Sequence, residues 1–137
     1  MDKNFGIWLD HEKAAIVTIN NGLTTISHLN AETENDNHSL HGASASATHF
    51  GHQEVTLERK IERRHKEHRH HYYQNIIHQI RDGKKILIFG PAEAKIELEK
   101  EIKKTNDLAS KIIAVESADK MTDHQIAAKV KNFFNNE

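Results

Sequence analysis

The sequence predicts an α/β domain in which helices cover a mixed β-sheet and one long basic helix protrudes from it. Three observations predict this class. The first thirty residues contain three short apolar or alternating runs, as strands do. The middle of the chain holds one long stretch with helical periodicity, and the remainder alternates strand and helix. A length of 137 residues fits a single domain covering residues 1–137.

The first three predicted elements are strands of an antiparallel meander. Residues 5–9 and 13–19 are mostly apolar, and residues 23–29 alternate between polar and apolar side chains. The residues Asn20-Asn21-Gly22 stand between the second and third strands, and Asn-Gly favours a tight hairpin because both residues tolerate positive φ. Asp10, which closes the first strand, is expected to be a turn residue that accepts backbone hydrogen bonds.

Residues 30–52 change in character and predict a flexible polar loop. One Leu and one Phe are the only large apolar residues in this segment. Such a composition buries too little apolar surface to offset the entropy of ordering the chain. Loops of this length are usually functional or disordered.

A long helix is predicted over residues 53–83. Its apolar residues recur at helical spacing, and Gly83 is expected to end it in the left-handed conformation. Between Arg59 and His71 the segment holds six Lys or Arg and four His. We therefore expect the N-terminal half to project into solvent as a basic rod. The C-terminal half is expected to pack on the sheet through Tyr72, Tyr73, Ile76, Ile77 and Ile80, and Ile61 continues the same helical spacing toward the N-terminus.

The rest of the chain predicts a strand, a helix, a strand and a helix. Residues 85–89 form the first strand, and a helix over 92–104 follows, with Pro91 placed for its first turn. A second strand covers residues 111–116. Thr122 and Gln125 have the spacing of a capping box that opens the last helix. The complete order is βββαβαβα, which is the element order of the ribonuclease-H-like fold.

Composition excludes several classes of protein. The chain has no cysteine, which excludes disulfides and thiolate metal sites and fits a cytoplasmic location. No apolar run approaches the roughly 18–20 residues of a membrane span, and the N-terminus has no signal-peptide pattern. The formal net charge is −1, so only the local distribution of charge can indicate a nucleic-acid partner.

Four segments carry a resemblance to a known family. They read FGIWLDHEKAAIV, ERKIERRHKEHRHHYYQNII, KILIFGPAEAKIELEKEI and KIIAVESADKMT. In this succession the chain resembles the central domain of class-1 peptide-chain release factors. It also resembles that domain's bacterial stand-alone relatives, the translational-machinery-component and host-attachment-type proteins. The family's strand-Gly-x-Ala-x-x-Lys-x-x-Leu segment is matched in character but not in literal spacing by Gly90, Ala92, Lys95 and Leu98. The resemblance implies a fold and an association with the ribosome.

One departure from that family bears on activity. Release factors place a Gly-Gly-Gln tripeptide before the corresponding helix to assist hydrolysis of peptidyl-tRNA. Here the segment reads Gly51-His52-Gln53, without the Gly-Gly pair. We therefore expect a protein that is not an enzyme and contacts the ribosome without releasing peptides.

The basic rod predicts contact with ribosomal or transfer RNA. Its cations can bind phosphates, and Tyr72, Tyr73 and the histidine rings could stack on unpaired bases. The predicted RNA-binding residues are Arg59, Lys60, Arg63, Arg64, Lys66, Arg69 and Tyr72. The alternative is an ordinary solvated face, in which Glu58 and Glu62 neutralise the cations through i,i+4 ion pairs.

Three further hypotheses follow from the same helix and its neighbours. His65, His68 and His71 are spaced at three residues and could bind Zn²⁺, Ni²⁺ or Cu²⁺, with His41 or His49 completing a site. The projecting helix could instead pair with a second copy and form a homo-oligomer. Nuclease chemistry is disfavoured because Asp10 and the glutamates of the long helix lack a third convergent carboxylate at residues 89–92.

Overall fold

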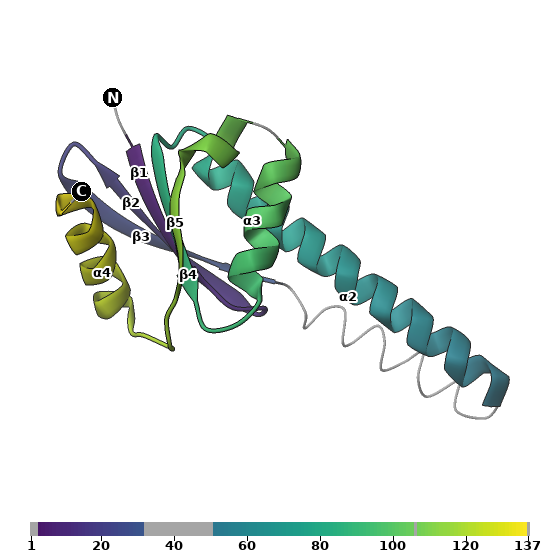
Figure 1. Ribbon diagram of the computed structural model, residues 1–137. Helices are drawn as coiled ribbons and strands as arrows, with labels where there is room; N and C mark the ends of the chain where they lie inside the picture. The colour runs from purple at the N-terminus through teal and green to yellow at the C-terminus, as the bar shows by residue number, and fades with distance from the viewer. Residues whose placement is uncertain (1–2, 32–50, 106, 137) are drawn as a thin grey trace.

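The computed structural model describes residues 3–31, 51–105 and 107–136, with side chains described from residue 59 onward in the first of its helices. Within this part of the chain, five strands form one mixed open sheet that three α-helices accompany (Figure 1). The predicted α/β class is confirmed. The predicted polar loop lies mostly outside the described residues. None of the described helices combines the length and the apolar character needed to cross a bilayer.

The first three strands are the predicted antiparallel meander. They are β1 (Lys3–Leu9), β2 (Lys13–Asn20) and β3 (Leu23–Asn30). Asn21 and Gly22 have φ angles of 55° and 81°, and the residues that flank them pair directly, so a two-residue hairpin turn joins β2 to β3 as predicted.

Two further strands extend the sheet on the other side of β1. The strand β4 (Lys85–Gly90) pairs parallel with β1, and β5 (Ile112–Ser117) pairs parallel with β4. The strand order across the sheet is β3-β2-β1-β4-β5. Because β1 and β4 are buried on both faces, they read as nearly continuous apolar runs rather than as alternating strands.

Helices cover both faces of this sheet. The helices α2 (Gly51–Ile80) and α3 (Ala94–Thr105) lie on one face, and α4 (Asp123–Asn135) lies on the other (Figure 1). A hydrophobic core lies on each face of the sheet, and alternate residues of β1 point into one or the other. Ile7 packs in the core under α2 and α3, whereas Trp8 packs in the core under α4. The indole of Trp8 also donates a hydrogen bond of 3.1 Å to the Asp119 carbonyl.

The N-terminus of α4 has the predicted capping box. The Thr122 hydroxyl accepts a hydrogen bond from the Gln125 amide at 3.2 Å, and the Gln125 side chain accepts one from the Thr122 amide at 2.9 Å. These two bonds satisfy amide groups that have no partner within the helix. Ile126 and Val130 then bury the apolar stripe of α4 against the sheet.

Both ends of α2 differ from the prediction. The helix spans residues 51–80 rather than 53–83, so its first two residues come from the segment expected to be loop. Gly83 is not in the left-handed conformation. Its amide donates to the Ile80 carbonyl at 2.9 Å, and a Cβ at this position would lie 2.6 Å from the Phe5 ring. Glycine is therefore needed here because the side chain of β1 passes close to the backbone, not because the helix turns left-handed.

Two corrections concern the segments around α3. Pro91 lies three residues before the helix rather than in its first turn, and the Glu93 carbonyl accepts the first helical hydrogen bonds. A short 3-10 helix, η1 (Asp107–Lys111), stands before β5, where the sequence predicted the strand to begin at residue 111. Leu108 anchors η1 in the core beneath α3.

Candidate nucleic-acid interface

The helix α2 has two halves with different surroundings. Its C-terminal half packs on the sheet, and five of its side chains are buried: Tyr72, Tyr73, Ile76, Ile77 and Ile80. Its N-terminal half extends well beyond the edge of the sheet (Figure 1). The prediction of a helix that is half core and half projecting rod is confirmed.

The cations of the projecting half lie at the surface. Arg59, Lys60, Arg63, Arg64 and Lys66 are exposed, and the Arg69 side chain is 41% exposed. Among the described residues, no ion pair involves Arg59, Lys60, Arg63 or Lys66. The predicted i,i+4 pair between Glu62 and Lys66 is thus not formed, and the Glu58 side chain lies outside the described residues.

Tyr72 does not belong to this surface, so the prediction that its ring stacks on a base is wrong. The side chain is only 2% exposed, and its hydroxyl donates a hydrogen bond of 3.1 Å to the Asp10 carbonyl. Burial raises the pKa of the Tyr72 phenol, and the nearby Asp10 carboxylate raises it further. Tyr72 therefore anchors α2 to the turn between β1 and β2.

Asp10 itself has the structural role that the sequence predicts. Its Oδ1 accepts hydrogen bonds from the amides of Glu12 at 2.8 Å and Lys13 at 2.9 Å. One of its carboxylate oxygens is thus occupied by the backbone of the turn.

The junction between α2 and α3 is built on Glu97. Tyr73 of α2 donates its hydroxyl to Glu97 Oε1 at 2.6 Å, and Arg69 Nε lies 3.8 Å from the same oxygen. His11, in the β1–β2 turn, also places its Nε2 3.3 Å from Glu97 Oε1. Burial raises the pKa of Tyr73, and the hydrogen bond to Glu97 adds to that effect.

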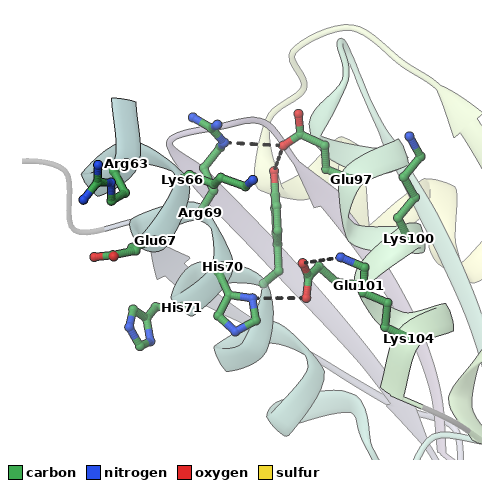
Figure 2. A pocket seen from close by; sticks show the side chains of 11 residues that line it. Arg63, Lys66, Glu67, Arg69, His70, His71, Glu97, Lys100, Glu101 and Lys104 are labelled. Carbon is green, nitrogen blue, oxygen red and sulfur yellow. Dashed lines mark hydrogen bonds and ion pairs between the residues drawn. The ribbon is translucent and has the colours of Figure 1, made fainter. Parts of the chain in front are cut away.

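A second carboxylate of α3 makes a parallel set of contacts one helical turn further on. Glu101 Oε2 accepts a hydrogen bond from the side-chain Nε2 of Gln74 at 3.2 Å and lies 3.3 Å from His70 Nδ1. Its other oxygen lies 3.8 Å from Lys104 Nζ (Figure 2). Together, Glu97 and Glu101 hold α2 against α3 and fix the direction in which the rod leaves the domain.

The histidines proposed as metal ligands are not gathered into one site. Among the described residues, no group of three or more His, Asp or Glu could hold one metal ion. Helix geometry accounts for this, since residues six apart, such as His65 and His71, point about 120° away from each other. His41 and His49 lie outside the described residues.

The structure also contains a groove that the sequence does not predict. It has a volume of about 620 Å³ and opens between the projecting half of α2 and the outer face of α3 (Figure 2). Its second wall carries Lys100 and Lys104, which are both exposed. Their i,i+4 spacing was visible in the sequence, but that spacing does not indicate which helix they face. The lining residues are Arg63, Lys66, Glu67, Arg69, His70, His71, Tyr73, Glu97, Lys100, Glu101 and Lys104.

Comparisons with known proteins give structural likenesses but no sequence match. No protein-family model matches this sequence, and a search of curated proteins finds none that is similar. Among solved structures, the fold is similar to the crystal structure of an archaeal translation termination factor, aRF1, with a TM-score of 0.48 and 13% sequence identity. The match covers 98% of this chain but 39% of the termination factor, so this chain spans well under half of that protein's length.

Proposed function

We propose that this is a non-catalytic, cytoplasmic protein of translation that contacts ribosomal or transfer RNA through the Arg59–Arg69 surface of α2. One observation carries the proposal. Arg59, Lys60, Arg63 and Lys66 are exposed on a helix that extends away from the domain, and within the described residues none of them is in an ion pair. Unpaired cations on a rigid projecting element are suited to a polyanion.

The physical basis of such binding is release of counterions from the RNA. Each phosphate neutralised by Lys or Arg releases condensed cations, so affinity falls steeply as salt rises. A helix held at one end by Tyr72 and Tyr73 loses little entropy when it binds, because its direction is already fixed. The projecting half of α2 can therefore contact RNA while the sheet remains outside the RNA-binding surface.

The proposal includes a family assignment. Within it, the domain is a ribonuclease-H-like relative of the release-factor central domain. The succession of strands and helices and the four resembling sequence segments support this assignment. The absence of a Gly-Gly pair before α2 favours contact with RNA without hydrolysis of peptidyl-tRNA.

The test is binding to purified ribosomes and to transfer RNA across a series of salt concentrations. Arg63→Glu/Arg64→Glu should abolish co-sedimentation with ribosomes, since it reverses two charges on the rod. Lys120→Glu/Lys131→Glu is the matched control, because it makes the same change in net charge at exposed positions near and on α4. Binding by the rod variant that equals that of the control, or that ignores salt, removes the RNA assignment.

The two alternatives have separate tests. Ile61 is the only aliphatic residue between Arg59 and His71, which leaves little apolar surface there for a helical pair. Sedimentation of the wild-type chain at several concentrations tests self-association. Metal binding by His65, His68 and His71 is tested by the metal content of untagged protein, with His68→Ala as the variant that interrupts both pairs.

A further inference from the structure

The groove between α2 and α3 brings together cations from two helices that are distant in sequence. Arg63, Lys66 and Arg69 come from α2, and Lys100 and Lys104 come from α3. Figure 2 shows the two sets on either side of the junction formed by Glu97 and Glu101. Lys100 and Lys104 were not part of the surface that the sequence predicted, and the projecting rod alone does not contain them.

The acidic residues of the groove are largely engaged already. Glu97 is bound by the Tyr73 hydroxyl at 2.6 Å and lies 3.8 Å from Arg69 Nε. Glu101 is bound by Gln74 at 3.2 Å and also lies near Lys104. These contacts offset the negative charge of both carboxylates at the base of the groove, where α2 and α3 meet.

The remaining charges of the groove are mostly positive. Arg63, Lys66 and Lys100 are exposed and, among the described residues, have no acidic partner within 4.0 Å. Glu67, which also lines the groove, is the opposing charge, and its carboxylate and the Arg63 guanidinium lie on the same side of α2 in Figure 2. The surface between the two helices is therefore complementary to a chain of phosphates.

The groove lacks a tyrosine platform on which bases could stack. The Tyr73 ring is only 3% exposed, and its hydroxyl is occupied by Glu97. Proteins that bind single strands combine cations with exposed aromatic rings, because the stacked bases supply much of the affinity. Proteins that bind double-stranded RNA rely mostly on its shape and on contacts to phosphates and 2′-hydroxyls. Of the residues that line the groove, only His70 and His71 carry exposed rings, and His70 lies 3.3 Å from Glu101. The five Lys and Arg side chains outnumber them, so the groove is closer to the second kind.

We propose that the α2–α3 groove holds the phosphodiester backbone of a double-helical RNA segment, with Lys100 and Lys104 on one wall and Arg63 and Lys66 on the other. This inference rests on the proposed function, since it names the part of the RNA that the surface takes. It implies weak dependence on base sequence. It also implies that α3 contributes to affinity although it lies on the body of the domain.

The experiment measures fluorescence anisotropy with a blunt RNA duplex of about 20 base pairs and with a single-stranded oligouridine of equal length, across a salt series. Lys100→Gln/Lys104→Gln removes the charges of the second wall and keeps helix-compatible side chains. Lys120→Gln/Lys131→Gln is the control with the same loss of charge elsewhere. Urea unfolding of each variant confirms that the exposed substitutions leave the fold intact.

Lys100→Gln/Lys104→Gln should lower the slope of log affinity against log salt by about 2, which is about one per lysine. If the wild type and this variant bind the duplex with equal affinity near 1 M salt, that slope change corresponds to roughly hundredfold weaker binding by the variant at 0.1 M. The control variant should bind as the wild type does, and Glu67→Gln should strengthen binding. Oligouridine should bind more weakly than the duplex.

Three outcomes overturn the claims separately. If Lys100→Gln/Lys104→Gln binds like its control while Arg63→Glu/Arg64→Glu does not bind, α2 acts alone and only the groove assignment fails. If oligouridine binds as tightly as the duplex, the double-helical occupant is wrong. If Arg63→Glu/Arg64→Glu binds RNA like the wild type, the proposed function fails and the groove assignment fails with it.

Discussion

The Tyr73 hydroxyl donates a hydrogen bond of 2.6 Å to Glu97 Oε1, and this contact joins the long helix α2 to α3. The Tyr72 hydroxyl, one residue earlier, donates to the neutral backbone carbonyl of Asp10 at 3.1 Å. The two neighbouring phenols thus differ mainly in the charge of the acceptor.

Removal of the two hydroxyls should therefore have unequal effects. Tyr73→Phe should lower the free energy of unfolding by about 1.5–3 kcal/mol, since hydrogen bonds to charged groups are the stronger ones. Tyr72→Phe serves as the comparison and should lower it by about 0.5–1.5 kcal/mol. Urea unfolding of both variants measures the difference, and an equal or larger loss in Tyr72→Phe would contradict the role given to Glu97.

Ionisation of the tyrosines should be coupled to unfolding at alkaline pH. Tyr72 and Tyr73 are the only tyrosines of the chain, and burial raises the pKa of both above the ordinary value of 10.0. Above pH 10 the unfolded chain releases protons that the folded chain retains. Stability is thus fully present below pH 10 and falls above it, by about 1.4 kcal/mol per pH unit for each tyrosine.

Absorbance of the phenolate follows this ionisation directly. The folded protein should give no phenolate signal near pH 10, and the signal should appear together with the loss of helical circular dichroism at higher pH. Tyr72→Phe should halve the final amplitude. A reversible phenolate signal near pH 10 in a chain that is still helical would show that the two side chains are not buried.

The close contact between β1 and α4 should make Gly6 sensitive to the smallest substitution. A Cβ at Gly6 would lie 2.2 Å from Val130 Cγ2. Gly6→Ala should therefore lower the free energy of unfolding by about 1–3 kcal/mol, because it overpacks this core. The double variant Gly6→Ala/Val130→Ala should lose less than the sum of the single variants, since the truncated valine makes room for the new methyl group. Strict additivity in urea unfolding would rule out this contact.

The capping box of α4 should contribute measurably to stability. Thr122→Ala removes the side-chain acceptor for the Gln125 amide and should lower the free energy of unfolding by about 1 kcal/mol. Thr122→Ser keeps a hydroxyl acceptor and should retain most of that stability. Thermal unfolding followed by circular dichroism compares the two variants. Equal melting temperatures for Ala and Ser at this position would mean that the hydroxyl does not stabilise the helix.

Features determined by neighbouring residues could be read directly from the sequence. The Asn21-Gly22 hairpin, the Asp10 turn and the Thr122–Gln125 capping box each depend on chemistry within three residues of the chain. The strands and helices follow from hydrophobic periodicity, because burial of one face imposes a repeat. The basic character of the projecting half of α2 was visible for the same reason, since it is a property of one continuous segment.

Features that depend on distant segments were decided only by the tertiary structure. The sequence does not indicate that the Tyr72 hydroxyl meets Asp10, sixty-two residues away, and so the prediction that this ring belongs to the RNA-binding surface is wrong. The local sequence predicts a helix cap at Gly83, because it does not show that the Phe5 ring lies close to this backbone. The groove likewise arises from the angle between α2 and α3, which Glu97 and Glu101 fix. Local sequence determined what each element is and which charges it carries. Packing between elements decided which of those side chains remain accessible, because accessibility depends on everything that covers a residue and not on its own segment alone.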